Sequence, residues 1–324
     1  MNSSRRTPDL HVTGSIPHSG VKSIWSEEKS TPLIGEDILP SDETTLVKSG
    51  EANEFARSGT GIQLVSATLM VQQRKTRLWR LGSGLKLVLL HGEFGNAATY
   101  WQAVAPALAS QVELICPDLP GFGDSEPLAT PRLQSHLFWL RDLLGQVAAE
   151  PIVVGGSGYG AVVARFFASR YPEQVRHLIL SGGGDIVRQS PVQRWLDRLA
   201  GKSRSDVDPG KSRTLGRLFY SPRDYCTPDF VRRAERERIA ALQALRSLET
   251  DPLPTAWTPS CPTLLIWGND DRYCSLARQR ALANEMKDPR TVEIFEAGHL
   301  VAIEQPKRFS AHVLDFLQRL LQTR

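Results

Sequence analysis

The sequence predicts an α/β fold, in which a mostly parallel β-sheet is covered by helices on both faces. Short apolar runs alternate with segments of helical spacing along most of the chain. Turns rich in Gly and Pro separate these segments. The chain has 324 residues, of which 41% are hydrophobic and 23% charged. These values are typical of a globular protein that is large enough to bury a sizeable core.

Each predicted strand is a short run of apolar residues. Two of them, 61–71 and 76–81, alternate in polarity and are expected to pair antiparallel, before a turn at 82–84. The later strands are expected to be buried and lie at 85–90, 112–116, 152–154, 176–180, 263–267 and 291–296. Segments with helical spacing lie at 97–110, 131–147, 159–170, 276–286 and 306–321. This alternation predicts parallel pairing through helical crossovers.

The chain divides into three parts by composition. Residues 1–60 are rich in Ser, Thr, Glu and Pro without a sustained period, which predicts a disordered polar tail. The tail is either a leader without function or a segment for protein docking or non-classical export. The α/β core is expected at 61–184 and 261–324, and the Arg-rich segment 185–260 is expected to form a helical cap. Such a cap would lie over the carboxyl ends of the strands, where ligands bind in these sheets.

Composition also limits the partners. The net charge is +4, and the sequence has no block of consecutive Lys or Arg residues, so nucleic-acid binding is not predicted. The sequence contains no apolar stretch of about 18 residues or more, so no membrane span is predicted. No secretory signal is recognised either, and we therefore expect a cytoplasmic protein. The four cysteines form no CxxC pair and are expected to be reduced. Neither a phosphate-binding Gly loop nor a metal-spaced His/Cys cluster is present, so no cofactor or metal is predicted.

Five short motifs follow one another at characteristic spacing. They are His91-Gly92, the loop from Asp118 to Ser125, the glycine-rich run from Gly155 to Gly160, the segment from Trp267 to Asp271, and Gly298-His299. In this order they resemble the α/β-hydrolase family, over residues 61–324. The resemblance implies nucleophilic acyl transfer, in which a serine at a sharp strand-to-helix turn loses its proton to a histidine that a carboxylate orients.

The resemblance assigns the histidine and the acid to two loops. His299 follows a predicted strand and precedes the last helix, where the family's catalytic histidine lies. The family pattern Gly-x-x-Asp indicates Asp271 as the acid. Its neighbour Asp270 is the alternative, although its side chain is as well explained by a bond to its own turn.

The nucleophile motif, Gly-x-Ser-x-Gly in the family, fits the sequence in two frames. In the first frame Ser157 is the nucleophile and Gly155 precedes it correctly, but Tyr159 fills the position of the second glycine. A one-residue bulge next to glycines would accommodate this frame. Because the acid and the histidine are both in place, we predict Ser157 as the nucleophile.

The second frame lies one residue later. Gly156 and Gly160 then flank the motif correctly, but Gly158 stands at the nucleophile position. Pro172 lies 14 residues after Gly158, and this is the spacing at which familiar relatives close the following helix. A glycine there also resembles the N-myc downstream-regulated proteins, a non-catalytic branch of the family. The alternative to catalysis by Ser157 is therefore an inactive pseudo-hydrolase that binds or regulates.

Backbone amides would stabilise the negative charge of the reaction. The expected donors are Gly158 and either Glu93 or Phe94. The Glu93 carboxylate would repel an oxyanion unless it is turned away or protonated.

The predicted function is a serine hydrolase that cleaves an ester-like or carbon–carbon bond in a small, partly apolar substrate. Lyase, dioxygenase or haloperoxidase chemistry in the same pocket is a third possibility. A serine mechanism requires the Ser157 hydroxyl within hydrogen-bond reach of His299. A pseudo-hydrolase instead requires Gly158 at the tip of the turn.

Overall fold

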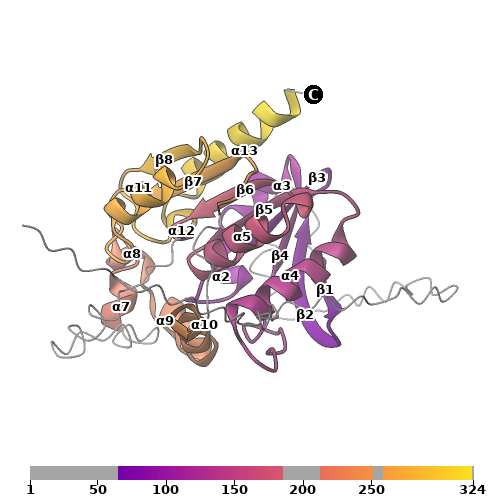
Figure 1. Ribbon diagram of the computed structural model, residues 1–324. Coiled ribbons are helices and arrows are strands. Elements are labelled where there is room, and N and C mark those ends of the chain that lie inside the picture. The colour runs from indigo at the N-terminus through magenta and orange to yellow at the C-terminus, as the bar shows by residue number, and fades with distance from the viewer. Residues whose placement is uncertain (1–64, 185–211, 251–257, 323–324) are drawn as a thin grey trace, which may run out of the picture. The chain divides into compact units, whose positions relative to one another are not determined.

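One eight-stranded sheet organises the residues that the computed structural model describes, which are 65–184, 212–250 and 258–322 (Figure 1). The predicted tail, 1–60, lies outside the described residues. The same is true of 185–211 and 251–257 in the predicted cap. The tail and the limits of the cap therefore stay predictions.

The sheet is mostly parallel, as the sequence predicts. Its strands, in chain order, are β1 (Val65–Val71), β2 (Arg74–Leu81), β3 (Leu85–Leu90), β4 (Val112–Pro117), β5 (Ile152–Ser157), β6 (Val175–Ser181), β7 (Thr263–Gly268) and β8 (Arg290–Ile294). Their spatial order is β1-β2-β4-β3-β5-β6-β7-β8. The pairs β1–β2 and β2–β4 are antiparallel, and every later pair is parallel. The carboxyl ends of strands β3 to β8 therefore share one edge.

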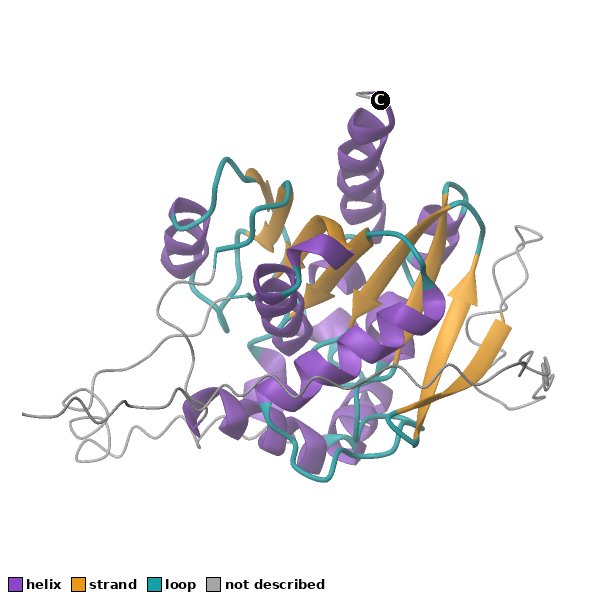
Figure 2. Cartoon of the chain, turned by 45° about the vertical axis from the view of Figure 1, so that its right-hand side comes forward, coloured by secondary structure: helices purple, strands orange, loops and turns teal. Residues whose placement is uncertain are grey.

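Helices cover both faces of this sheet (Figure 2). In the core they are α2 (Ala97–Trp101), α3 (Ala105–Ala109), α4 (Leu133–Val147), α5 (Tyr159–Arg170), α11 (Leu276–Asn284), α12 (Val301–Glu304) and α13 (Pro306–Gln322). Alternate residues of β3 serve the two faces: Leu87 and Leu89 pack with α2, α3 and α13, whereas Val88 and Leu90 pack with α4 and α5. This period of two is what a central strand between two helical layers requires.

The helix predicted at 97–110 is two helices, α2 and α3. The side chain of Asn96 caps α2 by accepting from the Thr99 N–H at 3.0 Å. Pro106 lies in the first turn of α3. Proline inside one continuous helix would remove a hydrogen bond and clash with the preceding turn, so the chain breaks and restarts here.

The segment between β6 and β7 is helical where the structure describes it. Its helices are α7 (Ser212–Gly216), α8 (Pro222–Tyr225), α9 (Pro228–Arg236) and α10 (Arg238–Thr250). Leu218 and Phe219, after α7, are fully buried and join the core cluster on the α13 face. No helix within the described ranges is long and apolar enough to cross a membrane.

Candidate active site at the carboxyl edge of the sheet

The loops after four parallel strands bring the candidate residues to one edge of the sheet. Glu93 follows β3, Gly158 follows β5, Asp271 follows β7 and His299 follows β8. Parallel strands place the loops at their carboxyl ends side by side, which is where α/β sheets bind ligands. These four residues come from segments far apart in the sequence, and the fold alone gathers them.

The turn from β5 into α5 has Gly158 at its tip. Gly158 adopts φ 53° and ψ −121°, a combination that residues with a side chain rarely adopt. Ser157 is the last residue of β5 and pairs with Ser181 of β6. The Gly158 N–H donates to the Ser181 carbonyl at 3.1 Å. The sharp strand-to-helix turn therefore falls at Gly158, one residue after Ser157.

The bulge that would carry Ser157 to the tip is not observed. The pairing of β5 with β6 runs in step from Val153 to Ser157, and its one irregularity lies between Ile152 and Val153. Close backbone contacts at the two glycines of the second frame also favour that frame. A Cβ on Gly156 would lie 2.4 Å from the Gly160 carbonyl carbon, and one on Gly160 would lie 2.4 Å from the Leu90 carbonyl oxygen. Glycine is therefore required sterically at 156 and 160.

Asp271 and His299 form a buried pair. The Asp271 Oδ2 atom lies 2.9 Å from His299 Nδ1, and each side chain is 1% exposed. Asp271 Oδ1 accepts from the backbone N–H groups of Tyr273 and Cys274, at 2.8 and 2.7 Å. The carboxylate is thus fixed by its own loop, and a hydrogen on Nδ1 leaves the Nε2 lone pair free. The neighbouring Asp270 does not take this place.

Two carboxylates determine the charge state of His299. Burial by itself disfavours the imidazolium, but the negative charges of Asp271 and Glu93 outweigh it and raise the pKa of His299 above its ordinary value of 6.5. The His299 backbone N–H donates to the Leu218 carbonyl at 2.7 Å, so the segment before α8 holds the histidine loop. The two carboxylates therefore favour the protonated imidazole against the effect of burial.

The imidazole Nε2 atom of His299 is buried and has no hydrogen-bond partner in the described part of the chain. Ser157 Oγ is thus not hydrogen-bonded to the imidazole, as a serine–histidine pair would require. The aromatic rings of Tyr273 and Phe94 lie edge-on to the imidazole, with centroids at 4.6 and 6.4 Å. The imidazole is therefore flanked by aromatic rings, and its Nε2 atom is without a hydrogen-bond partner among the described residues.

The Glu93 carboxylate lies against the tip of the turn. It is 2% exposed, and its Oε2 atom accepts from the Tyr159 N–H at 2.9 Å. The Tyr273 hydroxyl donates to Oε1 at 3.1 Å. A Cβ placed on Gly158 would lie 2.5 Å from Glu93 Oε2. The carboxylate therefore occupies the space in which a nucleophilic side chain at position 158 would begin.

Two of the three predicted oxyanion amides, those of Gly158 and Phe94, donate to other groups. The Gly158 N–H belongs to the pairing with β6, and the Phe94 N–H donates to the Tyr100 hydroxyl at 3.2 Å. The amide after the tip is that of Tyr159, and it already serves Glu93. With Ser157 as the nucleophile, the motif indicates the Gly158 amide and not that of Tyr159, and no motif indicates the hydroxyl of Tyr273.

His91, in the first motif, has a structural role. Its Nε2 accepts from the Leu119 N–H at 2.8 Å, and its Nδ1 lies 2.8 Å from the Gly92 carbonyl. Complete burial lowers the pKa of His91 to about 4, so the ring is neutral at physiological pH. A neutral ring with Nδ1 donating satisfies both contacts and ties the loop of Glu93 to the Asp118 loop.

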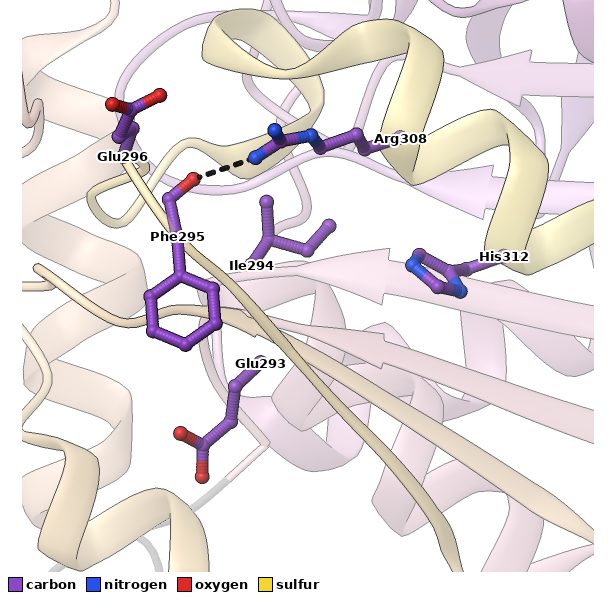
Figure 3. Close-up of a pocket in the computed structure, with 6 residues that line it drawn as sticks. All are labelled: Glu293, Ile294, Phe295, Glu296, Arg308 and His312. Atoms are coloured by element: carbon purple, nitrogen blue, oxygen red, sulfur yellow. Dashed lines mark hydrogen bonds between the residues drawn. The ribbon is translucent and has the colours of Figure 1, made fainter.

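A separate pocket of about 600 Å³ lies between the end of β8 and α13 (Figure 3). It is lined by Glu293, Ile294, Phe295, Glu296, Arg308 and His312. None of these is a predicted site residue, and Arg308 uses its guanidinium to hold the Phe295 carbonyl at 3.2 Å. Within the described residues no three His, Cys, Asp or Glu side chains converge as a metal site would require.

Fold and site together define an α/β hydrolase, and the chain belongs to this family: the sequence model of the alpha/beta hydrolase family matches residues 87–312. The chain is 28% identical over 261 residues to a 2-hydroxymuconate semialdehyde hydrolase of Pseudomonas sp. strain CF600, covering 75% of this chain and 90% of that one. It is 31% identical over 257 residues to a pimeloyl-[acyl-carrier protein] methyl ester esterase of Aeromonas hydrophila, covering 74% and 97%.

The solved structures agree on the fold. A meta-cleavage product hydrolase from Pseudomonas fluorescens IP01 superposes with a TM-score of 0.64. The identity is 21%, over 78% of this chain and 98% of that one. At this identity the likeness bears on the fold alone.

Proposed function

We propose that this chain hydrolyses an ester-like or carbon–carbon bond in a small, partly apolar substrate, with Asp271 and His299 as its acid–base pair. The observation that carries the proposal is the buried imidazole of His299, bonded through Nδ1 to Asp271 and unpaired at Nε2. A histidine fixed in this way offers one nitrogen for proton exchange with a substrate. The names of the relatives, which are carbon–carbon hydrolases and an esterase, support the reaction class.

We propose further that Ser157 is not the nucleophile. Its position in β5 and the unpaired Nε2 of His299 both argue against a serine–histidine pair. Gly158 then takes the nucleophile position of the family and provides no side chain for attack. The substrate would lie against Phe94 and Tyr273, beneath the proposed cap.

Two variants test this function on a panel of aryl esters, alkyl esters and vinylogous 1,5-diketones. His299→Ala should lose turnover by about a hundredfold to ten-thousandfold, the usual contribution of a general acid–base group. Ser157→Ala should keep turnover within a few-fold of the parent, and a fluorophosphonate probe should form no adduct. A histidine-dependent adduct on Ser157, with turnover lost in a folded Ser157→Ala protein, would restore the serine mechanism.

A binding or regulatory role without chemistry is the second candidate. The buried Glu93 carboxylate favours it, because a fixed negative charge at the Tyr159 amide opposes an anionic intermediate there. This candidate predicts no turnover across the panel from folded protein. It also predicts that small apolar ligands raise the melting temperature of the parent and of His299→Ala equally.

A further inference from the structure

We propose that the Glu93 carboxylate is the nucleophile of this site and attacks the acyl carbon of an activated acyl donor. The inference rests on the proposed hydrolase function and supplies the nucleophile that Gly158 cannot. Its basis is position: Glu93 Oε2 lies where a side chain at the tip of the turn would begin, so Oε1 of the same carboxylate lies beside that point. A different loop thus brings a carboxylate to the tip of the elbow, where Gly158 provides no side chain.

The carboxylate is held as a preorganised nucleophile would be. Both of its oxygens accept hydrogen bonds, one from a backbone amide and one from a phenol. The amide of Tyr159 is rigid at the start of α5, whereas the Tyr273 hydroxyl can rotate. Rotation of the Tyr273 hydroxyl therefore releases Oε1 for attack, while Oε2 stays on the amide. Tyr273 can then turn its O–H toward the acyl oxygen as negative charge develops there.

The first chemical step forms a mixed anhydride. Glu93 Oε1 bonds to the acyl carbon, and the bond from that carbon to the leaving oxygen or sulfur breaks. The leaving group departs with the electron pair and takes a proton from His299 Nε2. A carboxylate brings no proton to the histidine, unlike a serine hydroxyl, so His299 must hold one at the start. The charges of Asp271 and Glu93, which raise the pKa of His299, favour this protonated form.

The second step regenerates the site. Neutral His299 removes a proton from water, and the resulting hydroxide adds to the anhydride carbonyl. The anhydride C–O bond breaks, which releases the carboxylic acid and the free Glu93 carboxylate. The histidine is protonated again, so the sum is acyl donor plus water giving acid plus alcohol, phenol or thiol. No oxidant, reductant or metal enters the balance.

This nucleophile restricts the substrate class. A carboxylate is a weak nucleophile, and the anhydride that it forms is more reactive than an alkyl ester. Only a good leaving group makes the first step favourable, so aryl esters, enol esters and thioesters should react. Simple alkyl esters should not, and the ratio of their rates distinguishes this site from one with a serine.

Trapping with hydroxylamine tests the proposal on the intact protein. Turnover of an aryl ester in the presence of hydroxylamine should convert Glu93 to its hydroxamate and inactivate the protein with time. Fragmentation mass spectrometry would locate the label. The buried carboxylate of Glu304 provides an internal control that should stay unlabelled. Glu93→Gln should lose about a thousandfold in turnover and take no label.

The other outcomes separate the two proposals. A hydroxamate on Glu93 supports the anhydride, whereas hydroxamate on the released acyl product forms from attack at the other carbonyl and does not count against it. Histidine-dependent turnover that is retained in a folded Glu93→Ala protein would overturn the carboxylate nucleophile alone. Full turnover by a folded Glu93→Gln protein would do the same. Absence of turnover in the parent, or turnover unchanged in His299→Ala, would overturn the hydrolase proposal and the nucleophile with it.

Discussion

Two buried glutamates of this protein, Glu93 and Glu304, differ in what surrounds them. Both are nearly inaccessible, at 2% and 5% exposure. Glu304 Oε1 accepts from the N–H groups of Tyr220 and Ser221 at 2.8 and 3.1 Å, and its Oε2 accepts from the Gly298 N–H at 2.6 Å. It therefore joins the segment before α8 to the loop of the catalytic candidate histidine.

Glu93 has a different set of neighbours. One backbone amide and one rotatable hydroxyl bind it, and its charge acts on an imidazole whose Nε2 is unpaired among the described residues. The Glu304 carboxylate accepts from three backbone amides in two loops, so it acts as a structural joint, meaning a group that holds the two loops together. A carboxylate with one fixed donor beside a titratable ring has capacity left for chemistry. Partners, rather than burial or residue type, thus separate the two roles.

Replacing Glu93 with Gln should give the largest effect, and it should fall on turnover. The proposed nucleophile is lost, so turnover of an aryl ester should drop by about a thousandfold, within the range seen when one member of a catalytic set is removed. The free energy of unfolding should change by less than about 1 kcal/mol, because the amide oxygen of Gln can still accept from Tyr159. Steady-state kinetics and urea unfolding check both. A large loss of stability with unchanged turnover would reverse the comparison.

Replacing Glu304 with Gln should affect folding instead. The Gln amide nitrogen cannot accept, so at least one of the N–H groups of Tyr220, Ser221 and Gly298 loses its partner. Unsatisfied buried amides should lower the free energy of unfolding by roughly 2–4 kcal/mol. Glu296→Gln, at an exposed position in the loop of His299, is the matched control and should change little. Equal unfolding curves for the two variants would refute the role of Glu304 as a joint.

Much of this arrangement could be predicted from the sequence because it depends on local pattern. The apolar run at 85–90 became β3 with the same limits, and the expected alternation of strands and helices produced the parallel sheet. The resemblance to the α/β-hydrolase family also indicated the pairing of Asp271 with His299, and the structure shows this contact. The split of the helix at 97–110 was visible in principle, since Pro106 cannot continue a helix from its middle.

The frame of the elbow could not be decided from sequence. Both frames use the same run of Gly and Ser, and the choice depends on the register of β5 against β6, where Ser157 pairs with Ser181. The setting of Glu93 was equally hidden. Its hydrogen bonds join residues 66 and 180 positions apart, and no local pattern encodes contacts of that range.

Placing serine at the tip tests whether Glu93 truly occupies the nucleophile's space. In Gly158→Ser the new Cβ would meet Glu93 Oε2 at 2.5 Å and would adopt a strained φ of 53°. The free energy of unfolding should fall by about 1–3 kcal/mol. Gly145→Ser, where nothing lies within 4 Å of the added Cβ, is the matched control. Adding Glu93→Ala should relieve the clash and allow a fluorophosphonate adduct at position 158. No recovery in the double variant would contradict the overlap.

The pH dependence of stability gives the smallest effect and separates the two glutamates once more. Burial raises the pKa of Glu304 above its ordinary 4.5, although the amides of Gly298, Ser221 and Tyr220 oppose the shift. The pKa of His299 is raised above 6.5, because Asp271 and Glu93 outweigh burial. Each raised pKa means that the folded protein binds more protons than the unfolded chain between the two values.

The free energy of unfolding should therefore fall as pH rises through two windows, one starting near 4.5 and one near 6.5. Glu304→Gln should remove the first fall and leave the second. Asp271→Asn takes away the main charge that raises the pKa of His299, so it should lower the upper end of the second window and make that fall smaller. Urea unfolding over a pH series measures both. If Glu304→Gln altered the upper window, the charge of Glu304 would act on His299, and the division between joint and catalytic carboxylate would fail.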